Sequence, residues 1–159
     1  MRPTERIKEA QRVLEAEARA IFASSKKISL NFSKCIDLII DCKGTVVISG
    51  IGKSGNIGKK ITSTLASLGT PSIFLHTSDA FHGDLGILRR DDLLICISNS
   101  GETDELVRLL NYAKRNDIKS IAITGNVNST ISKEASISLN SSVESEACPL
   151  NLALHAPLQ

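Results

Sequence analysis

The chain has 159 residues, of which 42% are hydrophobic but only 3% aromatic, and its formal net charge is +2. A chain of this length can bury a core as one domain without disulfides or metal ions. The core must be mostly aliphatic, as is common in parallel α/β domains. Basic and acidic residues are interspersed, with no basic stripe among aromatics, so the composition argues against a nucleic-acid partner. It favours a small anionic ligand.

The cysteines and the N-terminus limit the class of protein further. Cys35, Cys42, Cys96 and Cys148 form no CxxC pair, which argues against a zinc ribbon or a thioredoxin-type site and predicts buried free thiols. No run reaches the roughly 18 apolar residues of a membrane span, and the charged N-terminus lacks the apolar stretch of a signal peptide. We therefore expect no membrane association and a cytoplasmic location.

Apolar spacing predicts alternating helices and strands. A first amphipathic helix is expected over residues 4–24, and a second begins at a Ser33 cap and ends at Gly44. β-Branched runs and helical spacings then predict strands at 45–49, 72–75, 92–97, 120–124 and 136–139, with helices at 57–68 and 102–114. Right-handed crossovers would give a three-layer α/β sandwich with a parallel sheet of about five strands. We expect residues 1–44 to supply helices that pack on a core of residues 45–159.

A glycine-rich loop, GIGKSG, follows the first predicted strand. Gly50, Gly52 and Gly55 let the backbone turn sharply and let a ligand approach its N–H groups. The loop lacks the spacer of a Walker A motif. Its GxGxxG spacing would suit a dinucleotide, but the next strand ends in Phe-Leu-His rather than an acidic residue, so no nucleotide cofactor is predicted. Lys53 is either a solvated lysine or a cation that faces a phosphate or sugar oxygen.

A second polar loop, SNSGET, follows the third predicted strand. Ser98, Ser100 and Thr103 supply three hydroxyls where a strand ends and a helix begins, and the helix dipole there favours an anion. These residues predict a phosphate cradle without a metal. The alternative is that they only cap the helix.

Three further residues are candidates for proton transfer. His82 stands beside a carboxylate in the glycine-flanked HGDLG segment, although a loop histidine can also be structural. A helix N-terminus would account for Glu102 through its dipole alone, which leaves Glu105 and Glu146 as the carboxylates of interest. Spacing does not decide which of the two is a base.

Four blocks, GIGKSGNIGKKI, TPSIFLHTSDAFHGDLGIL, ISNSGETDEL and EACPLNLA, together resemble the arabinose 5-phosphate isomerases of the sugar isomerase (SIS) domain superfamily. The resemblance implies a flavodoxin-like or Rossmann-like sheet and interconversion of D-ribulose 5-phosphate and D-arabinose 5-phosphate through a cis-enediol, a step toward lipopolysaccharide or capsule sugar (KDO). It also implies two groups of site residues: Gly52, Ser54, Ser98, Ser100 and Thr103 for substrate binding, and Lys53, His82, Glu105 and Glu146 for catalysis.

The resemblance carries further expectations. It implies no metal or redox cofactor, a sugar-phosphate partner and a homo-oligomer, expected to be a tetramer. The stretch 154–159, LHAPLQ, departs from the family pattern, so we expect a C-terminally truncated chain without the paired regulatory (CBS) domains of many relatives. A non-catalytic module that binds sugar phosphates is the alternative function.

Overall fold

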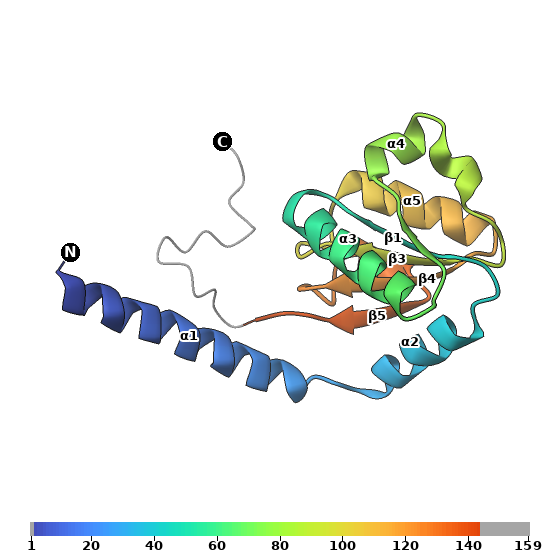
Figure 1. Cartoon of the computed structure of the whole chain (residues 1–159). Helices are drawn as coiled ribbons and strands as arrows, with labels where there is room; N and C mark the ends of the chain where they lie inside the picture. Colours follow the sequence, from blue (N-terminus) through green and yellow to red (C-terminus); the bar gives the residue numbers. More distant parts are fainter. Residues whose placement is uncertain (1, 144–159) are drawn as a thin grey trace. The chain divides into compact units, whose positions relative to one another are not determined.

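The computed structural model describes residues 2–143. By its contacts the chain divides into two compact units: one is Ser29–Ser141, and the other joins Met1–Ile28 to the segment from Ser142 onward. The larger unit contains the whole sheet and every helix after the first (Figure 1). All the predicted site residues except Glu146 belong to this unit.

All five strands of the larger unit pair in parallel. The strands are β1 (Val46–Gly50), β2 (Ser72–Phe74), β3 (Leu93–Ile97), β4 (Lys119–Thr124) and β5 (Ile137–Asn140). Their order across the sheet is β2-β1-β3-β4-β5. The predicted parallel sheet is confirmed, and each strand lies within one residue of its predicted start and end, because short aliphatic runs bounded by glycine and polar residues mark buried strands clearly.

The strand order places a topological switch point between β1 and β3. From β1 the chain moves outward to β2, and it then returns to the other side of β1 to add β3, β4 and β5. Gly50 at the end of β1 lies beside Ile97 at the end of β3. The loops after these two strands therefore leave the same edge side by side, and this crevice is where open α/β sheets bind their ligands.

Helices cover both faces of the sheet, as expected for three layers (Figure 1). On one face, α2 (Leu30–Asp41) and α3 (Gly52–Ser67) pack on a cluster that includes Ile48 and Ile95. On the other face, a cluster that includes Val47 and Leu94 packs against α4 (Thr77–Phe81), the 3-10 helix η1 (Asp84–Ile87), α5 (Asp104–Arg115) and α6 (Thr130–Glu134). Neighbouring residues of one strand thus pack against helices on opposite faces of the sheet.

Several element boundaries differ from those predicted. α2 begins at Leu30 with Ser29 as its N-cap rather than at Ser33, and α5 begins at Asp104 rather than at residue 102. α3 begins at Gly52, five residues earlier than its apolar spacing indicated. The predicted loop after β2 contains α4 and η1, and α6 was not predicted. Apolar spacing cannot detect a first helical turn of glycine and polar residues, or a helix of five residues.

The first helix, α1 (Pro3–Ser25), confirms the predicted helix at 4–24. None of its residues is buried, and Ile7, Leu14, Ile21 and Phe22 are exposed. Its packing on the core stays a prediction. No helix among the described residues is both long and apolar enough to cross a membrane.

Three of the four cysteines lie in the described part of the chain, and all three are free. Cys35 and Cys96 are buried, which confirms the prediction for them, whereas Cys42 is only half-buried. Burial raises the pKa of both the Cys35 and the Cys96 thiol. Cys148 lies outside the described residues.

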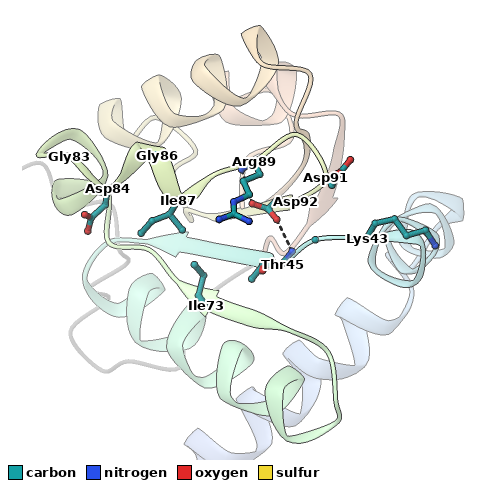
Figure 2. Close-up of a pocket in the computed structure, with 11 residues that line it drawn as sticks. Lys43, Thr45, Ile73, Gly83, Asp84, Gly86, Ile87, Arg89, Asp91 and Asp92 are labelled. Carbon is teal, nitrogen blue, oxygen red and sulfur yellow. Dashed lines mark hydrogen bonds between the residues drawn. The ribbon is translucent and has the colours of Figure 1, made fainter.

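The buried carboxylate of Asp92 joins the amino ends of β1 and β3 (Figure 2). Its Oδ1 accepts a hydrogen bond from the Thr45 N–H at 2.7 Å, and its Oδ2 accepts one from the Arg89 N–H at 2.8 Å. A Cβ at Gly44 would collide with Oδ1. Asp92 therefore fixes the start of two central strands and requires glycine beside it.

Replacing Asp92 with Ala is expected to lower the free energy of unfolding by about 2–6 kcal/mol, because two backbone N–H groups lose their acceptor at about 1–3 kcal/mol each. Denaturant unfolding measures the change. The exposed Asp91, whose side chain has no partner among the described residues, is the matched control. Asp91→Ala should change the stability by less than about 0.5 kcal/mol. Equal effects of the two substitutions would contradict the assigned role of Asp92.

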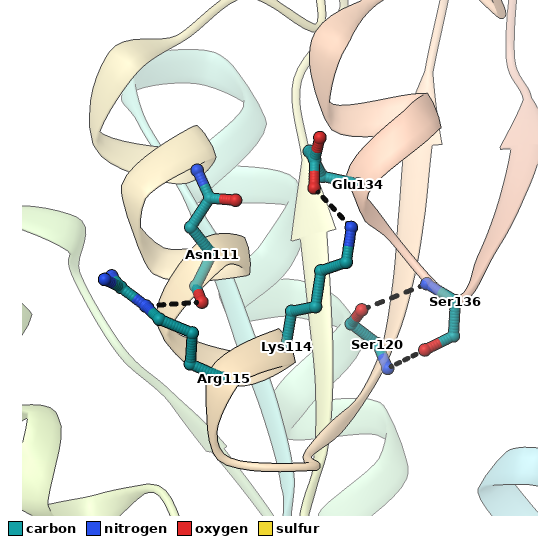
Figure 3. Close-up of polar contacts among 6 residues, drawn as sticks. All are labelled: Asn111, Lys114, Arg115, Ser120, Glu134 and Ser136. Atoms are coloured by element: carbon teal, nitrogen blue, oxygen red, sulfur yellow. Dashed lines mark hydrogen bonds and ion pairs between the residues drawn. The ribbon is translucent and has the colours of Figure 1, made fainter.

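Polar contacts join β4 to the segment before β5, at the far side of the sheet from β2 (Figure 3). The Ser120 N–H donates to Ser136 Oγ at 3.1 Å, and the Ser136 N–H donates to Ser120 Oγ at 3.2 Å. Nearby, Lys114 Nζ of α5 donates to a carboxylate oxygen of Glu134 in α6 at 2.9 Å. The Lys114–Glu134 pair joins α6 to α5, and the two serine hydrogen bonds join the segment after α6 to β4.

Candidate functional site

The loop after β1 is built on a close approach of strand and helix. A Cβ at Gly55 would lie 2.8 Å from the carbonyl oxygen of Gly50, so only glycine lets α3 begin so near the strand end. Gly52 has φ +58°, in the left-handed region that favours glycine. As a result Gly52, Lys53 and Ser54 form the first turn of α3, where backbone N–H groups lack partners within the helix.

The side chains of this first turn are available to a ligand. Lys53 is exposed, Ser54 is half-buried, and neither side chain has a partner among the described residues. The helix dipole adds positive potential at the same place. The predicted residues Gly52, Lys53 and Ser54 are therefore brought together at the carboxyl edge of β1.

The loop after β3 gathers its three hydroxyls. Ser98 Oγ lies 2.9 Å from Thr103 Oγ1 and 3.4 Å from Ser100 Oγ. The Gly101 N–H donates to Ser98 Oγ at 3.1 Å, and the Glu102 N–H donates to Ser100 Oγ at 3.3 Å. The hydroxyls form a compact group, called here the hydroxyl cluster (Ser98, Ser100 and Thr103), directly before α5.

Thr103 is the N-cap residue of α5, yet its side chain makes no capping hydrogen bond. Its hydroxyl turns to Ser98 instead, so the first N–H groups of α5 are left without this cap. An ordinary N-cap would direct its oxygen at those groups. Thr103 therefore does not cap α5 through its side chain, and anion binding by the hydroxyl cluster stays a prediction.

A layer of polar groups supports the hydroxyl cluster from behind. Gly101 has φ +71°, and a Cβ there would lie against Ser129 Oγ and 2.8 Å from Thr124 Oγ1. Thr124 Oγ1 in turn donates to the Asn99 carbonyl oxygen at 3.3 Å. Sequence analysis missed Thr124 and Ser129, although the position of Thr124 at the end of β4, next to β3, was a signal.

The sequence placed Glu102 in the first turn of a helix, where the helix dipole would account for it. In the structure Glu102 precedes α5, which begins at Asp104. Its carboxylate oxygens accept hydrogen bonds from the Thr130 N–H at 3.0 Å and the Thr130 hydroxyl at 2.6 Å. These bonds, the hydroxyl one first, lower the pKa of Glu102 below its usual 4.5. Glu102 therefore ties the polar loop to the start of α6.

This tie predicts a pH dependence of stability. A carboxyl whose pKa is lowered by folding stabilises the folded state above its unfolded pKa, and the contribution is lost as the pH falls through the folded pKa. The stability difference between the parent chain and Glu102→Gln should therefore shrink between about pH 6 and pH 3. Denaturant unfolding at a series of pH values measures it. A difference that stays constant over this range would contradict the assignment.

The three acid–base candidates occupy different places. Glu105 lies in the first turn of α5, half-buried, one residue beyond Asp104. His82 follows α4 as its C-cap and is exposed, and within residues 2–143 its side chain has no hydrogen-bond partner. Neither residue forms a hydrogen bond with Lys53 or with the hydroxyl cluster in the described structure. Glu146 lies outside the described residues.

A cavity lies at the opposite edge of the sheet from the predicted site residues. A pocket of about 610 Å³ is lined by residues that include Thr45, Asp84, Arg89 and Asp92, and none of the predicted site residues lines it (Figure 2). Thr45 and Asp92 precede β1 and β3, so this pocket opens toward the amino edge of those strands. Within the described part of the chain, no group of three or more His, Cys, Asp or Glu side chains is placed to hold a metal ion.

Comparisons with known proteins agree with the fold. The model of the SIS domain family matches residues 38–157, and the chain belongs to this family. A solved structure from E. coli CFT073, in complex with arabinose 5-phosphate, superposes with a TM-score of 0.90 at 37% identity, over 96% of this chain and 81% of that one.

Two curated relatives confirm the resemblance to arabinose 5-phosphate isomerases. The arabinose 5-phosphate isomerase KdsD of Pseudomonas aeruginosa is 48% identical over 147 residues, 92% of this chain and 45% of that protein. KpsF of E. coli O6:H1, also an arabinose 5-phosphate isomerase, is 47% identical over 148 residues, again 92% of this chain and 45% of that protein. The chain spans less than half the length of these relatives.

Proposed function

We propose that the chain interconverts D-ribulose 5-phosphate and D-arabinose 5-phosphate. The observation that carries the proposal is the hydroxyl cluster at the switch point, where Thr103 turns to Ser98 and leaves the N–H groups of α5 to a ligand. The relatives named above and the structure in complex with arabinose 5-phosphate support the choice of sugar phosphate. On this proposal the product serves the synthesis of KDO for lipopolysaccharide or capsule.

The phosphate would be held by neutral donors. A dianion accepts several hydrogen bonds, and short hydroxyls together with free N–H groups at the starts of α3 and α5 offer them without a cation. Ser54 would add a donor from the opposite layer. Lys53 is then free to face a sugar oxygen.

Substituting both Ser100 and Thr103 with Ala is expected to weaken the binding of arabinose 5-phosphate at least about tenfold, on the order of 1.4 kcal/mol, because two donors to the phosphate are lost. Calorimetry measures the affinity. The pair Thr64→Ala and Ser67→Ala, which removes two exposed hydroxyls near the far end of α3, is the control. An affinity unchanged by the first pair would exclude the hydroxyl cluster as the phosphate site.

The reaction requires a proton to move between neighbouring carbons. A carboxylate removes the proton from C1 of open-chain ribulose 5-phosphate, the electron pair forms the C1–C2 double bond of a cis-enediol, and the carbonyl oxygen at C2 takes up a proton. Return of a proton to C2 and loss of one from the C1 hydroxyl give the aldehyde. We propose Glu105 or Glu146 as the carboxylate, and Lys53 or His82 as the group that polarises the oxygens or opens the ring.

The proposal includes no metal or redox cofactor, and it places the protein in the cytoplasm as a homotetramer. Turnover of ribulose 5-phosphate by the purified 159-residue chain is the decisive experiment. Conversion to arabinose 5-phosphate at equilibrium would support the isomerase. Binding of arabinose 5-phosphate without any conversion would instead favour a non-catalytic module.

A further inference from the structure

The end of β2 lies at the same edge of the sheet as the ends of β1 and β3, which carry the two loops of the candidate site. The register pairs Ile48 of β1 with Phe74 of β2, and Ser49 Oγ donates to the Leu75 carbonyl oxygen at 2.7 Å. Continuing this register places His76 beside Gly50, level with the start of α3. His76 thus lies at the same edge of the sheet as Lys53 and the hydroxyl cluster.

The ring of His76 lies on the face of the sheet that α3 covers. Phe74 belongs to the cluster on that face, and its ring comes within 2.9 Å of a Cβ built at Gly58. Side chains alternate along a strand, and the backbone of His76 is extended, so His76 shares the face of Phe74. The two rings meet edge to face at 6.5 Å. Because α3 starts at this edge, the half-buried His76 lies near its first turn.

One hydrogen bond determines the tautomer of His76. The N–H of Ser78 donates to His76 Nδ1 at 3.3 Å, which also caps α4. An amide can only donate, so Nδ1 is unprotonated and the neutral ring carries its proton on Nε2. No described residue accepts a hydrogen bond from Nε2. The ring therefore presents Nε2–H as a donor at the edge where the substrate is expected.

We propose that His76 is a further substrate-binding residue, whose Nε2–H donates to an oxygen of the sugar while the hydroxyl cluster holds the phosphate. β2 and β3 flank β1, so their ends lie about 10 Å apart, two strand spacings. This separation is comparable with the length of an extended five-carbon sugar phosphate. The inference rests on the proposed function, since it takes a sugar phosphate as the ligand.

Two substitutions separate the two nitrogens of the ring. His76→Asn keeps an acceptor near the position of Nδ1, and so keeps the α4 cap, but it removes the Nε2 donor. His76→Gln places an amide donor near the position of Nε2 and loses the cap. Thermal unfolding, and calorimetry with arabinose 5-phosphate and with inorganic phosphate, are measured on the full chain for the parent and both variants.

His76→Asn should unfold at the temperature of the parent and bind inorganic phosphate equally well, but bind arabinose 5-phosphate about five- to tenfold more weakly. His76→Gln should unfold at a lower temperature and yet bind the sugar phosphate more tightly than His76→Asn. A merely structural histidine would give the opposite order, with affinity following stability.

Three results would overturn the proposal: unchanged affinity of His76→Asn for arabinose 5-phosphate, equal losses for phosphate and sugar phosphate, or a proton on Nδ1 in the ¹⁵N spectrum of the free chain. Failure of the proposed function is recognised separately, because a parent chain that binds the sugar phosphate without converting it removes the isomerase but keeps the role of His76. A parent that binds no sugar phosphate removes both.

Discussion

Replacing Glu105 with Gln is expected to lower kcat for ribulose 5-phosphate by about 10²–10⁴-fold, the usual contribution of a general base. Glu105 is half-buried in the first turn of α5, next to the hydroxyl cluster in the sequence, and its side chain has no partner among the described residues. Gln has the same shape but cannot take up the proton. Affinity for arabinose 5-phosphate should change little, because the phosphate contacts remain.

Asp104→Asn is the matched control for this experiment. Asp104 lies in the same first turn, is exposed and also carries a carboxylate, so its loss changes the local charge equally. Its kcat should stay within about twofold to threefold of the parent, since a screened surface charge has a small effect. If Glu105→Gln turns over as fast as the parent, the base lies elsewhere, and Glu146→Gln is then the variant to measure.

Gly101→Ala is expected to damage both the fold and the site. The added Cβ would meet Ser129 Oγ and Thr124 Oγ1, and φ of +71° is unfavourable for alanine. Left-handed strain of about 1–2 kcal/mol and overpacking of about 1–3 kcal/mol together predict a loss of about 2–5 kcal/mol in the free energy of unfolding. Because the shift displaces Ser100 and Thr103, affinity for arabinose 5-phosphate should fall more than about tenfold.

The control for Gly101 is Gly86→Ala. A Cβ at Gly86 would have no atom within 4 Å, and Gly86 is exposed in η1. Its substitution should leave stability within about 1 kcal/mol of the parent and should not change affinity. Denaturant unfolding and calorimetry measure both variants. A Gly101→Ala chain with the stability and affinity of the Gly86→Ala chain would mean that the loop adapts freely to a side chain there.

The sequence predicted the sheet well because its signals are local. Each strand is a short aliphatic run followed by glycine or polar residues, and the helices between strands leave only parallel pairing open. These signals also predict that two polar loops leave the same edge of the sheet. One loop carries Gly52, Lys53 and Ser54, and the other carries Ser98, Ser100 and Thr103. The family resemblance added the choice of sugar phosphate.

The features of the site that the sequence did not predict depend mainly on contacts between residues that are far apart in the chain. The partner of Glu102 is Thr130, 28 positions away, and no spacing rule links them. The direction of the Thr103 hydroxyl, toward Ser98 rather than the helix, follows from the fixed turn at Gly101. In the sequence, His76 served only as evidence against a dinucleotide site. Its tautomer follows from the hydrogen bond that Ser78 N–H donates to Nδ1, which only the structure shows.

The two helix starts that we propose to bind the phosphate belong to opposite layers of the sandwich, since α3 covers one face of the sheet and α5 the other. A phosphate bound by both helix starts would connect the two helical layers across the edge of the sheet. Without it, these layers are joined through the strands. Local opening of either helix start would then require release of the ligand. Amide hydrogen exchange in both first turns should slow together on saturation, and the whole fold should gain about 2.7 kcal/mol when the free ligand reaches about 100 times Kd.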